Sequence, residues 1–266
     1  MNIHPTAIID PAAELDGSVK IGPYVIIEKG VKIGSETTIK PHTVISGPTT
    51  IGSGNEIGPF ATIGAPPQDL KYKGEDTELV IGDNNIIREY VSIHRGTVTG
   101  NGITIIGNNN LLMGYVHIAH DCVIGNSVIL ANGATMAGHI YIDDHAIIGG
   151  LVAIHQFSRV GAYSYIGGHS GISKDVPPFI IVSGTRKQMR VSGINKIGLR
   201  RHGFDNETLK KLDKAYKIIF MTPDLLLKDA LEKTENEIPD CEPVSQLIDF
   251  FRSSKQGVIR TIGDSD

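Results

Sequence analysis

Aliphatic side chains recur at every sixth position along most of this chain. The series runs without exception from Ile3 to Ile63, resumes from Ile81 to Ile93, and continues one residue out of phase from Ile106 to Ile172. A period of six fits neither the 3.6-residue turn of an α-helix nor the two-residue alternation of an ordinary strand. It fits a short strand followed by a turn, so that three such units close one triangular coil. The pattern therefore predicts a mainly β protein, a parallel β-helix of hexapeptide repeats.

The neighbours of each aliphatic residue support this interpretation. Glycine often follows it, as at Gly22 and Gly125, and a small or β-branched residue often precedes it by two, as at Val25 and Cys122. Glycine tolerates the backbone angles of a tight corner, and small side chains suit a narrow interior. Cys122 is therefore predicted to be a core residue rather than a nucleophile. The period does not determine the hand of the coil.

Two irregular segments interrupt the repeat, at residues 64–80 and 95–102. The first carries several charged residues, among them Asp69 and Lys71. Long excursions from a regular scaffold are frequent binding elements. Asp69 and Lys71 are therefore candidate substrate contacts, and an ordinary solvated pair of charges is the alternative.

The six-residue pattern ends at Pro178, and helical spacing of apolar residues replaces it. Asn206 is predicted to cap one helix, Pro223 to open a second, and Glu242 to open a third. The predicted domains are a hexapeptide-repeat β-helix over residues 1–185 and a C-terminal α-helical domain over residues 186–266.

Composition narrows the class of protein. Glycine makes up 31 of the 266 residues and tryptophan is absent, so the core must consist of small aliphatic contacts. A net charge of −4 with 20% charged residues argues against disorder and against nucleic-acid binding. The longest apolar run, 146–154, is too short to span a membrane, and no leader pattern precedes the repeat. We expect a cytoplasmic protein without stable membrane insertion.

One stretch is locally basic. No acidic residue lies between Asp175 and Asp205, whereas six basic ones do: Arg186, Lys187, Arg190, Lys196, Arg200 and Arg201. Such a patch suits phosphates or an acidic partner protein. An ordinary solvent-facing helix is the alternative.

Histidines fall at matching points of successive repeats. His120, His139 and His155 follow the inward aliphatic residues of three successive coils by one to three residues. Three imidazoles are therefore expected near one corner, with His117 at the edge of the same face. Imidazole titrates near neutral pH, so the column predicts acid–base chemistry. A zinc site is the alternative, and Asp121 either orients His120 or only decorates the corner.

Six motifs resemble those of the UDP-N-acetylglucosamine acyltransferases, which catalyse the first step of lipid A synthesis. They are QDLKY at 68–72, IHRGT at 93–97, HIAHDC at 117–122, AGH at 137–139, IHQF at 154–157 and GLRRHGF at 198–204. The resemblance implies a left-handed β-helix, an exception to the right-handed crossover rule, and a homotrimer with active sites between subunits. It also implies transfer of an (R)-3-hydroxyacyl chain from acyl carrier protein to the 3-hydroxyl of UDP-N-acetylglucosamine. No metal and no cofactor are implied, apart from the phosphopantetheine that holds the acyl group on the carrier.

The resemblance also assigns roles to single residues. His120 resembles the general base, Asp121 the group that orients and polarises it, and Gly138 the backbone donor to the thioester oxyanion. Gly168 matches the position that limits acyl length, where glycine resembles the long-chain members, although a plain corner glycine is the alternative. Substrate contacts are matched by Asp69, Lys71, His117, His139, His155 and Gln156, with Asn195 and Arg201 near the nucleotide.

Two positions depart from the family pattern. His202 replaces a common second arginine, and Ile197 stands where an acidic residue is frequent. These departures affect the expected nucleotide contacts rather than the reaction. Four other hexapeptide functions are alternatives: a later N-acyltransferase of the same pathway, an acetyl-CoA-dependent acetyltransferase, a zinc carbonic anhydrase and a non-catalytic scaffold.

Overall fold

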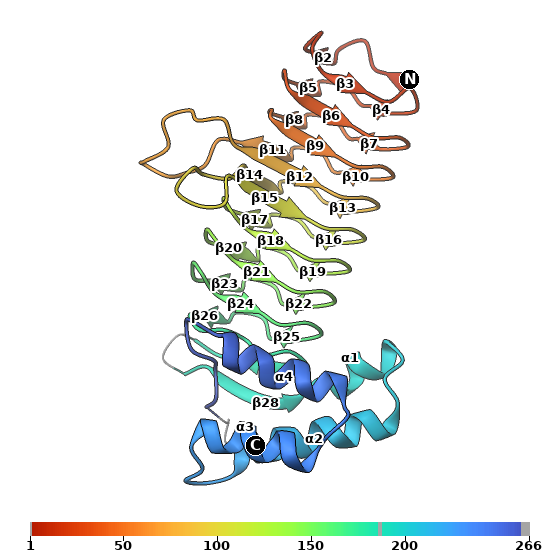
Figure 1. The fold of residues 1–266 in the computed structure, drawn as a ribbon. Coiled ribbons are helices and arrows are strands. Elements are labelled where there is room, and N and C mark those ends of the chain that lie inside the picture. The colour runs from red at the N-terminus through yellow and green to blue at the C-terminus, as the bar shows by residue number, and fades with distance from the viewer. Residues whose placement is uncertain (1, 186–187, 262–266) are drawn as a thin grey trace.

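The computed structural model describes residues 2–185 and 188–261. Short strands alternate with turns, and every third strand joins the same sheet, so that three sheets form the faces of a triangular prism (Figure 1). The strands pair in parallel register, one coil upon the next, apart from the last pair. The predicted parallel β-helix is confirmed.

The three faces are named in the order in which the chain visits them. The first face contains β1 (Asn2–Ile3), β4 (Lys20–Ile21), β7 (Thr38–Ile39), β10 (Glu56–Ile57), β13 (Ile86–Ile87), β16 (Leu111–Leu112), β19 (Ile129–Leu130), β22 (Ile147–Ile148), β25 (Tyr165–Ile166), β27 (Ile180–Ser183) and β28 (Arg190–Ile194). The second face contains β2 (Ile8–Ile9), β5 (Ile26–Ile27), β8 (Val44–Ile45), β11 (Thr62–Ala65), β14 (Ser92–His94), β17 (His117–Ile118), β20 (Thr135–Met136), β23 (Ala153–Ile154) and β26 (Gly171–Ile172). The third face contains β3 (Glu14–Leu15), β6 (Val31–Ile33), β9 (Thr49–Ile51), β12 (Glu78–Ile81), β15 (Ile103–Ile106), β18 (Val123–Ile124), β21 (Tyr141–Ile142) and β24 (Arg159–Val160).

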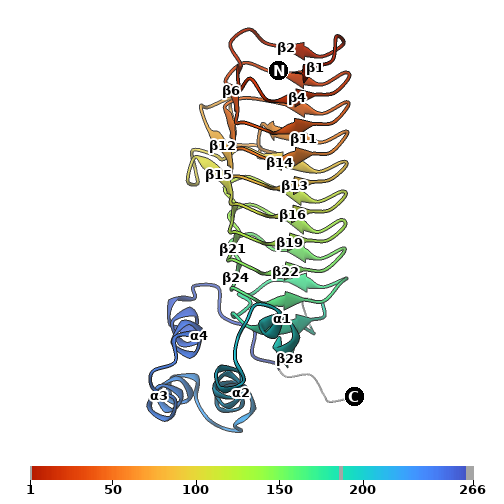
Figure 2. The same ribbon diagram turned by 90° about the vertical axis from the view of Figure 1, so that its right-hand side faces the viewer.

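Figures 1 and 2 together give the hand of the coil. In Figure 1 the third face points toward the viewer, its strands run from left to right, and the coil descends from the N-terminus. The coil is therefore left-handed, as the family resemblance implies, and it departs from the usual right-handed crossover.

The sixth-position aliphatic residues fill the interior of the prism. Ile57 and Ile148 are fully buried, and so are Val116 and Cys122 in the row two residues earlier. Ile3 is 39% exposed because no coil covers the first one. Burial raises the pKa of the Cys122 thiol to about 12, which fits its predicted core role.

Three corners separate the faces. The first corner joins the first face to the second, the second corner joins the second face to the third, and the third corner leads back to the first face. Asp121 and His139 at the second corner take left-handed φ angles of 59° and 61°, and His145 at the third corner takes one of 60°. The backbone is held there by hydrogen bonds between coils, such as that from His139 N to His120 O at 3.0 Å.

Both irregular segments leave the prism at the second corner, one above the other (Figure 1). Arg95 ties the root of the first segment to the coils. Its Nη1 donates to the carbonyl oxygens of Gly47 and Gly64, both at 2.7 Å, and its Nη2 donates to the Tyr72 hydroxyl at 3.1 Å. Because these carbonyls lie on the coil, the segment that carries Asp69 is fixed at its base.

The prism ends in an antiparallel hairpin of β27 and β28. The predicted domain boundary at residue 185 falls within this hairpin, and Arg186 and Lys187 of the predicted basic patch lie outside the described residues. Four helices follow below the prism (Figure 2): α1 (Lys196–Arg201), α2 (Asn206–Met221), α3 (Leu227–Glu237) and α4 (Glu242–Ser253). None of the described helices has the length and apolar character needed to cross a membrane.

The helix starts were predicted with mixed success. Glu242 opens α4 as expected. Asp205, rather than Asn206, caps α2, because its carboxylate accepts a hydrogen bond from Thr208 N at 2.7 Å. The predicted helix start at Pro223 is wrong. Asp224 takes a left-handed φ of 58°, which does not fit a right-handed helix, and α3 begins at Leu227.

Candidate active site

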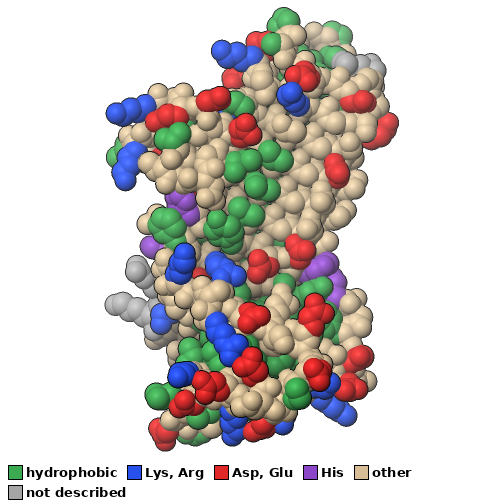
Figure 3. All heavy atoms as spheres, viewed as in Figure 1, with side chains coloured by type: hydrophobic (Ala, Val, Ile, Leu, Met, Phe, Trp, Pro, Cys, Tyr) green, Lys and Arg blue, Asp and Glu red, His purple; other side chains and the backbone are tan. Residues whose placement is uncertain are grey.

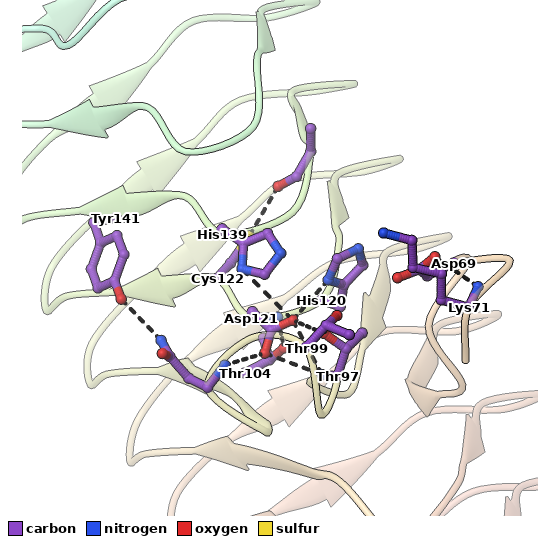
Figure 4. Close-up of polar contacts among 12 residues, drawn as sticks. Asp69, Lys71, Thr97, Thr99, Thr104, His120, Asp121, Cys122, His139 and Tyr141 are labelled. Atoms are coloured by element: carbon purple, nitrogen blue, oxygen red, sulfur yellow. Dashed lines mark hydrogen bonds and ion pairs between the residues drawn. The ribbon is translucent and has the colours of Figure 1, made fainter. Parts of the chain in front are cut away.

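The turns that follow β17, β20 and β23 bring several predicted site residues together at the second corner. His120 and Asp121 follow β17, Gly138 and His139 follow β20, and Phe157 follows β23. Figure 4 shows His120, Asp121 and His139 turned toward one another, next to the turn of the second irregular segment that carries Thr97 and Thr99. We call this group the histidine corner.

The carboxylate of Asp121 is fully buried at the centre of the histidine corner. Its Oδ2 accepts hydrogen bonds from His120 Nδ1 at 2.8 Å and from Thr97 Oγ1 at 2.6 Å, and its Oδ1 accepts one from Asn101 N at 2.9 Å. Burial alone would raise the pKa of Asp121, but the hydrogen bonds from His120 and Thr97 outweigh it and lower the pKa to about 2. Asp121 is thus an anion that orients His120, rather than a surface decoration.

This arrangement decides which nitrogen of His120 is available. Because an ionised carboxylate accepts a hydrogen bond from Nδ1, the neutral imidazole carries its proton there. The lone pair then belongs to Nε2, the nitrogen that can accept a proton from a substrate.

Thr97 is a part of the site that the sequence analysis missed. Its backbone N–H lies 3.1 Å from each Asp121 carboxylate oxygen, in addition to the hydroxyl contact. The turn around it presses Gly100 against the same carboxylate, where a Cβ would collide with Asp121. The sequence did contain a signal for this contact, because the second irregular segment leaves the prism at the same corner as His120, one coil earlier in the chain.

Gly138 lies against the ring of His120. A Cβ built at Gly138 would lie 2.6 Å from His120 Cε1 and 2.9 Å from Nε2, closer than carbon atoms approach. Its N–H has no acceptor among the residues that the structure describes, while its carbonyl accepts a hydrogen bond from Phe157 N at 3.2 Å. Glycine therefore keeps room for the imidazole, and a free backbone donor lies beside it.

His139 completes the histidine corner. Its ring meets His120 edge-on with centroids 5.1 Å apart and stacks on Phe157 at 4.6 Å. Burial lowers the pKa of His139, and Asp121 opposes this shift. The neutral form is therefore favoured.

His155 does not join the other two imidazoles as the column predicted. It is exposed, and its Nδ1 lies 3.2 Å from the carbonyl oxygen of its neighbour Gln156, which is also exposed. Among the described residues, the donor atoms that lie within 4.8 Å of one another come from His120, Asp121 and His139. The residues that the structure describes therefore assemble no set of three histidines for zinc within one chain.

His117 lies on the second face, next to a histidine that the sequence analysis did not single out as a site residue. His117 Nδ1 is 2.8 Å from Ser92 Oγ, and its ring meets His94 edge-on at 4.9 Å. Burial lowers the pKa of His117, and burial together with the two neighbouring histidines lowers that of His94 to about 4. His94 is therefore neutral near physiological pH.

Asp69 and Lys71 belong to the first irregular segment, which Figure 4 shows beside His120. Asp69 Oδ1 accepts a hydrogen bond from Lys71 N at 2.9 Å, so the two residues form one turn. The charge of Asp69 also acts to raise the pKa of His139, which places it within electrostatic reach of the histidine corner.

Three predicted site residues lie at other corners of the same chain. Gly168 is at the first corner, in the same turn position as Gly150 one coil earlier, and a Cβ there would lie 3.2 Å from Gly150 O. Asn195 caps α1 at the third corner: its Oδ1 accepts from Gly198 N at 3.1 Å and its Nδ2 donates to Tyr163 O at 2.9 Å. Arg201 is exposed at the end of α1.

The two family departures also lie on α1 or just after it. The ring of His202 packs against His145 at 4.6 Å and against Tyr163 at 5.3 Å. Ile197 is largely exposed. His202 thus has a packing role at the third corner, away from the histidine corner.

One groove lies on the second face and another at the first corner. One, of about 500 Å³, crosses the second face and is lined by His117, Thr135, Ala137, Ala153, His155 and Gly171. The other, of about 520 Å³, lies at the first corner and is lined by Tyr115, Gly133, Gly150, Leu151, Gly168 and His169. Small side chains open both grooves, and both are mostly apolar.

Comparisons with known proteins agree with the fold and the motifs. Residues 30–65 and 103–138 match the family described as bacterial transferase hexapeptide (six repeats), and residues 175–259 match the second domain of UDP-N-acetylglucosamine O-acyltransferase. An acyl-[acyl-carrier-protein]–UDP-N-acetylglucosamine O-acyltransferase from Thermodesulfovibrio yellowstonii is 55% identical over 97% of this chain and 99% of the relative. The enzyme of the same name from Syntrophobacter fumaroxidans is 50% identical over 98% and 100%.

Solved structures give the same result. The UDP-N-acetylglucosamine O-acyltransferase of Moraxella catarrhalis superposes with a TM-score of 0.93 at 48% identity, over 98% of this chain and 100% of that one. The corresponding Acinetobacter baumannii structure gives 0.93 at 48%, over 97% and 99%. Among the functions considered for a hexapeptide protein, the O-acyltransferase is the one that these relatives carry. The chain belongs to the UDP-N-acetylglucosamine O-acyltransferase family.

Proposed function

We propose that this chain transfers an (R)-3-hydroxyacyl group from acyl carrier protein to the 3-hydroxyl of UDP-N-acetylglucosamine, the first step of lipid A biosynthesis. The full-length relatives are named for the transfer of an acyl group from acyl carrier protein to an oxygen of UDP-N-acetylglucosamine. The structural observation that supports it is His120, with a buried anion on Nδ1 and the free N–H of Gly138 beside its ring. A base and an oxyanion donor in contact are what acyl transfer to a hydroxyl requires.

In the proposed mechanism, His120 Nε2 takes the proton of the sugar hydroxyl as its oxygen attacks the thioester carbon. The ionised Asp121 stabilises the imidazolium that forms. The N–H of Gly138 donates to the oxyanion of the tetrahedral intermediate. Collapse breaks the carbon–sulfur bond, and the proton on His120 passes to the departing thiolate, so that the ester and a free thiol leave a neutral imidazole.

The acyl chain is proposed to run along the two grooves. From the histidine corner it crosses the second face, past Ala153 and Gly171, and reaches Gly168 at the first corner. Glycine leaves this end open, which favours long chains. Asp69, Lys71, His117, His139, His155 and Gln156 remain the proposed contacts to the sugar, the pyrophosphate and the acyl chain.

A homotrimer explains why the predicted site residues are divided among corners. If the first corners of three prisms face a common axis, the second corner of one subunit meets the third corner of the next, where α1 carries Asn195 and Arg201. The first face offers an aliphatic surface for this packing, because Ile86 is 45% exposed and Leu111, Ile129 and Ile147 are half-buried. We infer a cytoplasmic trimer that acts without metal, cofactor or nucleic acid.

The test is direct. The purified protein is incubated with UDP-N-acetylglucosamine and (R)-3-hydroxyacyl carrier proteins of several chain lengths, and products are identified by mass spectrometry. An O-acylated nucleotide sugar, formed best from long chains, is expected. The 3-deoxy sugar nucleotide is the matched control and must give none. Absence of transfer from every carrier-bound acyl group would overturn the proposal.

A further inference from the structure

The second irregular segment, residues 95–102, folds over the carboxylate of Asp121. The side chain of Asp121 has no exposed surface, whereas that of its neighbour His120 is 16% exposed. In Figure 3, histidine side chains reach the surface at the left edge of the third face, directly below the projecting segments. Solvent therefore reaches the proposed base, but the hydrogen-bond partners of the carboxylate behind it come from the protein.

Thr97 supplies two of the donors that surround this carboxylate. Its hydroxyl donates to Oδ2 at 2.6 Å, and its backbone N–H lies 3.1 Å from both oxygens. Asn101 N donates to Oδ1 at 2.9 Å, and His120 Nδ1 donates to Oδ2 at 2.8 Å. The Thr97 hydroxyl and the imidazole therefore share one oxygen of Asp121.

The turn around Thr97 is held by contacts within the protein. Gly100 N donates to Thr97 O at 3.0 Å, and a Cβ at Gly100 would collide with the Asp121 carboxylate. Asn101 Nδ2 donates to the Tyr141 hydroxyl at 2.9 Å, which fastens the turn to the third face. Figure 4 shows this turn next to Asp121. The donors to the carboxylate are thus in place without any substrate contact.

Sharing an oxygen has a consequence for the base. Each hydrogen bond to an ionised carboxylate stabilises its charge, so the charge that Thr97 stabilises attracts the imidazolium of His120 less strongly. A general base acts only in its unprotonated form, and an undivided charge on Asp121 would favour the protonated one. The hydroxyl contact also prevents Oδ2 from turning away from His120 Nδ1.

We propose that Thr97 is a positioning residue that acts through Asp121. Its hydroxyl fixes the carboxylate against His120 Nδ1 and moderates the negative charge that the imidazole faces. The second irregular segment is thereby a part of the catalytic apparatus, although its threonine touches neither the base nor the reacting atoms. The inference rests on the proposed function.

Other charged or titratable side chains also lie around His120. They come from β14, from the turn after β20 and from the first irregular segment: His94, His139, Asp69 and Lys71. Removing the hydroxyl of Thr97 changes none of them. A change in the pH dependence of catalysis would therefore report the contact between Thr97 and Asp121.

Thr97→Ala removes the hydroxyl and keeps both backbone contacts. We expect kcat to fall about 10-fold near neutral pH, the scale of one hydrogen bond to a charged group, with KM for UDP-N-acetylglucosamine unchanged. The acid limb of the profile of kcat/KM against pH should move upward by roughly half a pH unit to one unit. Thr97→Ser, which keeps the hydroxyl, should restore the native limb and most of kcat.

Thr43→Ala is the matched control. Thr43 is fully buried, and its hydroxyl donates to Lys40 O at 2.9 Å and to Gly58 O at 2.8 Å, at the first corner. This variant should lose stability and keep the native kcat and acid limb. Should Thr97→Ala fail to fold, as judged by thermal melting, Thr97→Cys replaces it. Its thiol is a weak donor, so the acid limb should move in the same direction.

Several outcomes would overturn the inference and leave the proposed function standing. A lowered kcat with the native acid limb would mean that Thr97 only supports the turn, and so would a shifted limb that Thr97→Ser does not restore. An equal shift in Thr43→Ala would trace the effect to lost stability. A raised KM for UDP-N-acetylglucosamine with native kcat would make Thr97 a substrate contact instead. Absence of transfer by the native protein would end both proposals.

Discussion

Gly138 and the imidazole of His120 lie so close that a single methyl group at position 138 would occupy the space of the ring, 2.6 Å from its Cε1 atom. The two residues come from consecutive coils, so their contact depends on the stacking of β17 on β20. The proposed base and the proposed oxyanion donor are therefore a matched pair, and changing one displaces the other.

Gly138→Ala should lower kcat by about 10²-fold, the lower end of the contribution of a positioned general base, because the methyl group displaces the ring of His120. Gly138 is not among the residues with left-handed φ, so the backbone tolerates alanine and the melting temperature should change little. Gly17→Ala is the control, since Gly17 has the same turn position and open space around it. Full activity of Gly138→Ala would show that catalysis does not require the His120 ring in its native position.

His120→Ala should lose about 10²–10⁴-fold in kcat, the usual contribution of a positioned general base. The side chain projects from a corner and does not fill the core, so the proposed trimer and its unfolding temperature should persist. Steady-state kinetics and sedimentation check both points. Zinc bound by the native protein and lost with activity in His120→Ala and His139→Ala would favour a metal site instead.

Asp121→Asn should reduce both activity and stability. An amide NH₂ cannot accept the hydrogen bonds from Thr97 and Asn101 that the carboxylate accepts, and it leaves buried donors unsatisfied. A stability loss of about 1–3 kcal/mol is expected, measured by urea denaturation. Unchanged stability would mean that the segment around Thr97 rearranges freely.

His94 should make stability sensitive to mild acid. Burial and the neighbouring histidines lower its pKa from about 6.5 in the unfolded chain to about 4 in the native state. The unfolded state therefore binds more protons between these values, and stability contributed above pH 6.5 is lost as the pH falls toward 4. His94→Phe should reduce the pH dependence of the urea midpoint over this window. His169→Phe, at an exposed position, should leave that pH dependence unchanged. An equal pH dependence of the urea midpoint in both variants would show that His94 does not cause this acid sensitivity.

Gly168→Met should shift the preferred donor toward shorter acyl chains. Its side chain would enter the groove at the first corner, and its Cβ would lie 3.2 Å from Gly150 O. Competition between carrier-bound chains of different length, scored by mass spectrometry, measures the shift. An unchanged profile would remove Gly168 from chain-length selection.

The sequence predicted those parts of the molecule that depend on a local period. The six-residue period alone predicts which side chains point into the prism. The burial of Ile57 and Ile148 could therefore be predicted without knowing their neighbours. Contacts between coils at an irregular segment have no such period. Thr97 on Asp121 and Arg95 on Gly47 depend on how a loop folds over the corner, and the six-residue pattern carries no information about that.

The directions of the side chains at the corners could not be predicted from the sequence either. His139 and His155 occupy turn positions that differ by two residues, and this difference sends one ring toward Asp121 and leaves the other exposed on the second face. Asn195 was matched to a nucleotide contact by family resemblance, whereas both polar groups of its side chain cap α1 and tie it to Tyr163. A substrate contact would have to come from its remaining donor and acceptor capacity.

Gly150 and Gly168 occupy the same turn position on consecutive coils, and coils stack about 4.8 Å apart. If the acyl chain ends in this groove as proposed, the first corner measures its length like a graduated scale, with one division per coil. A bulky residue at 150 rather than 168 would move the stop by one division, a distance of a few methylene groups. Under this proposal, a chain of this fold would change the acyl length that it selects in steps of one coil, by a single substitution and without altering the backbone.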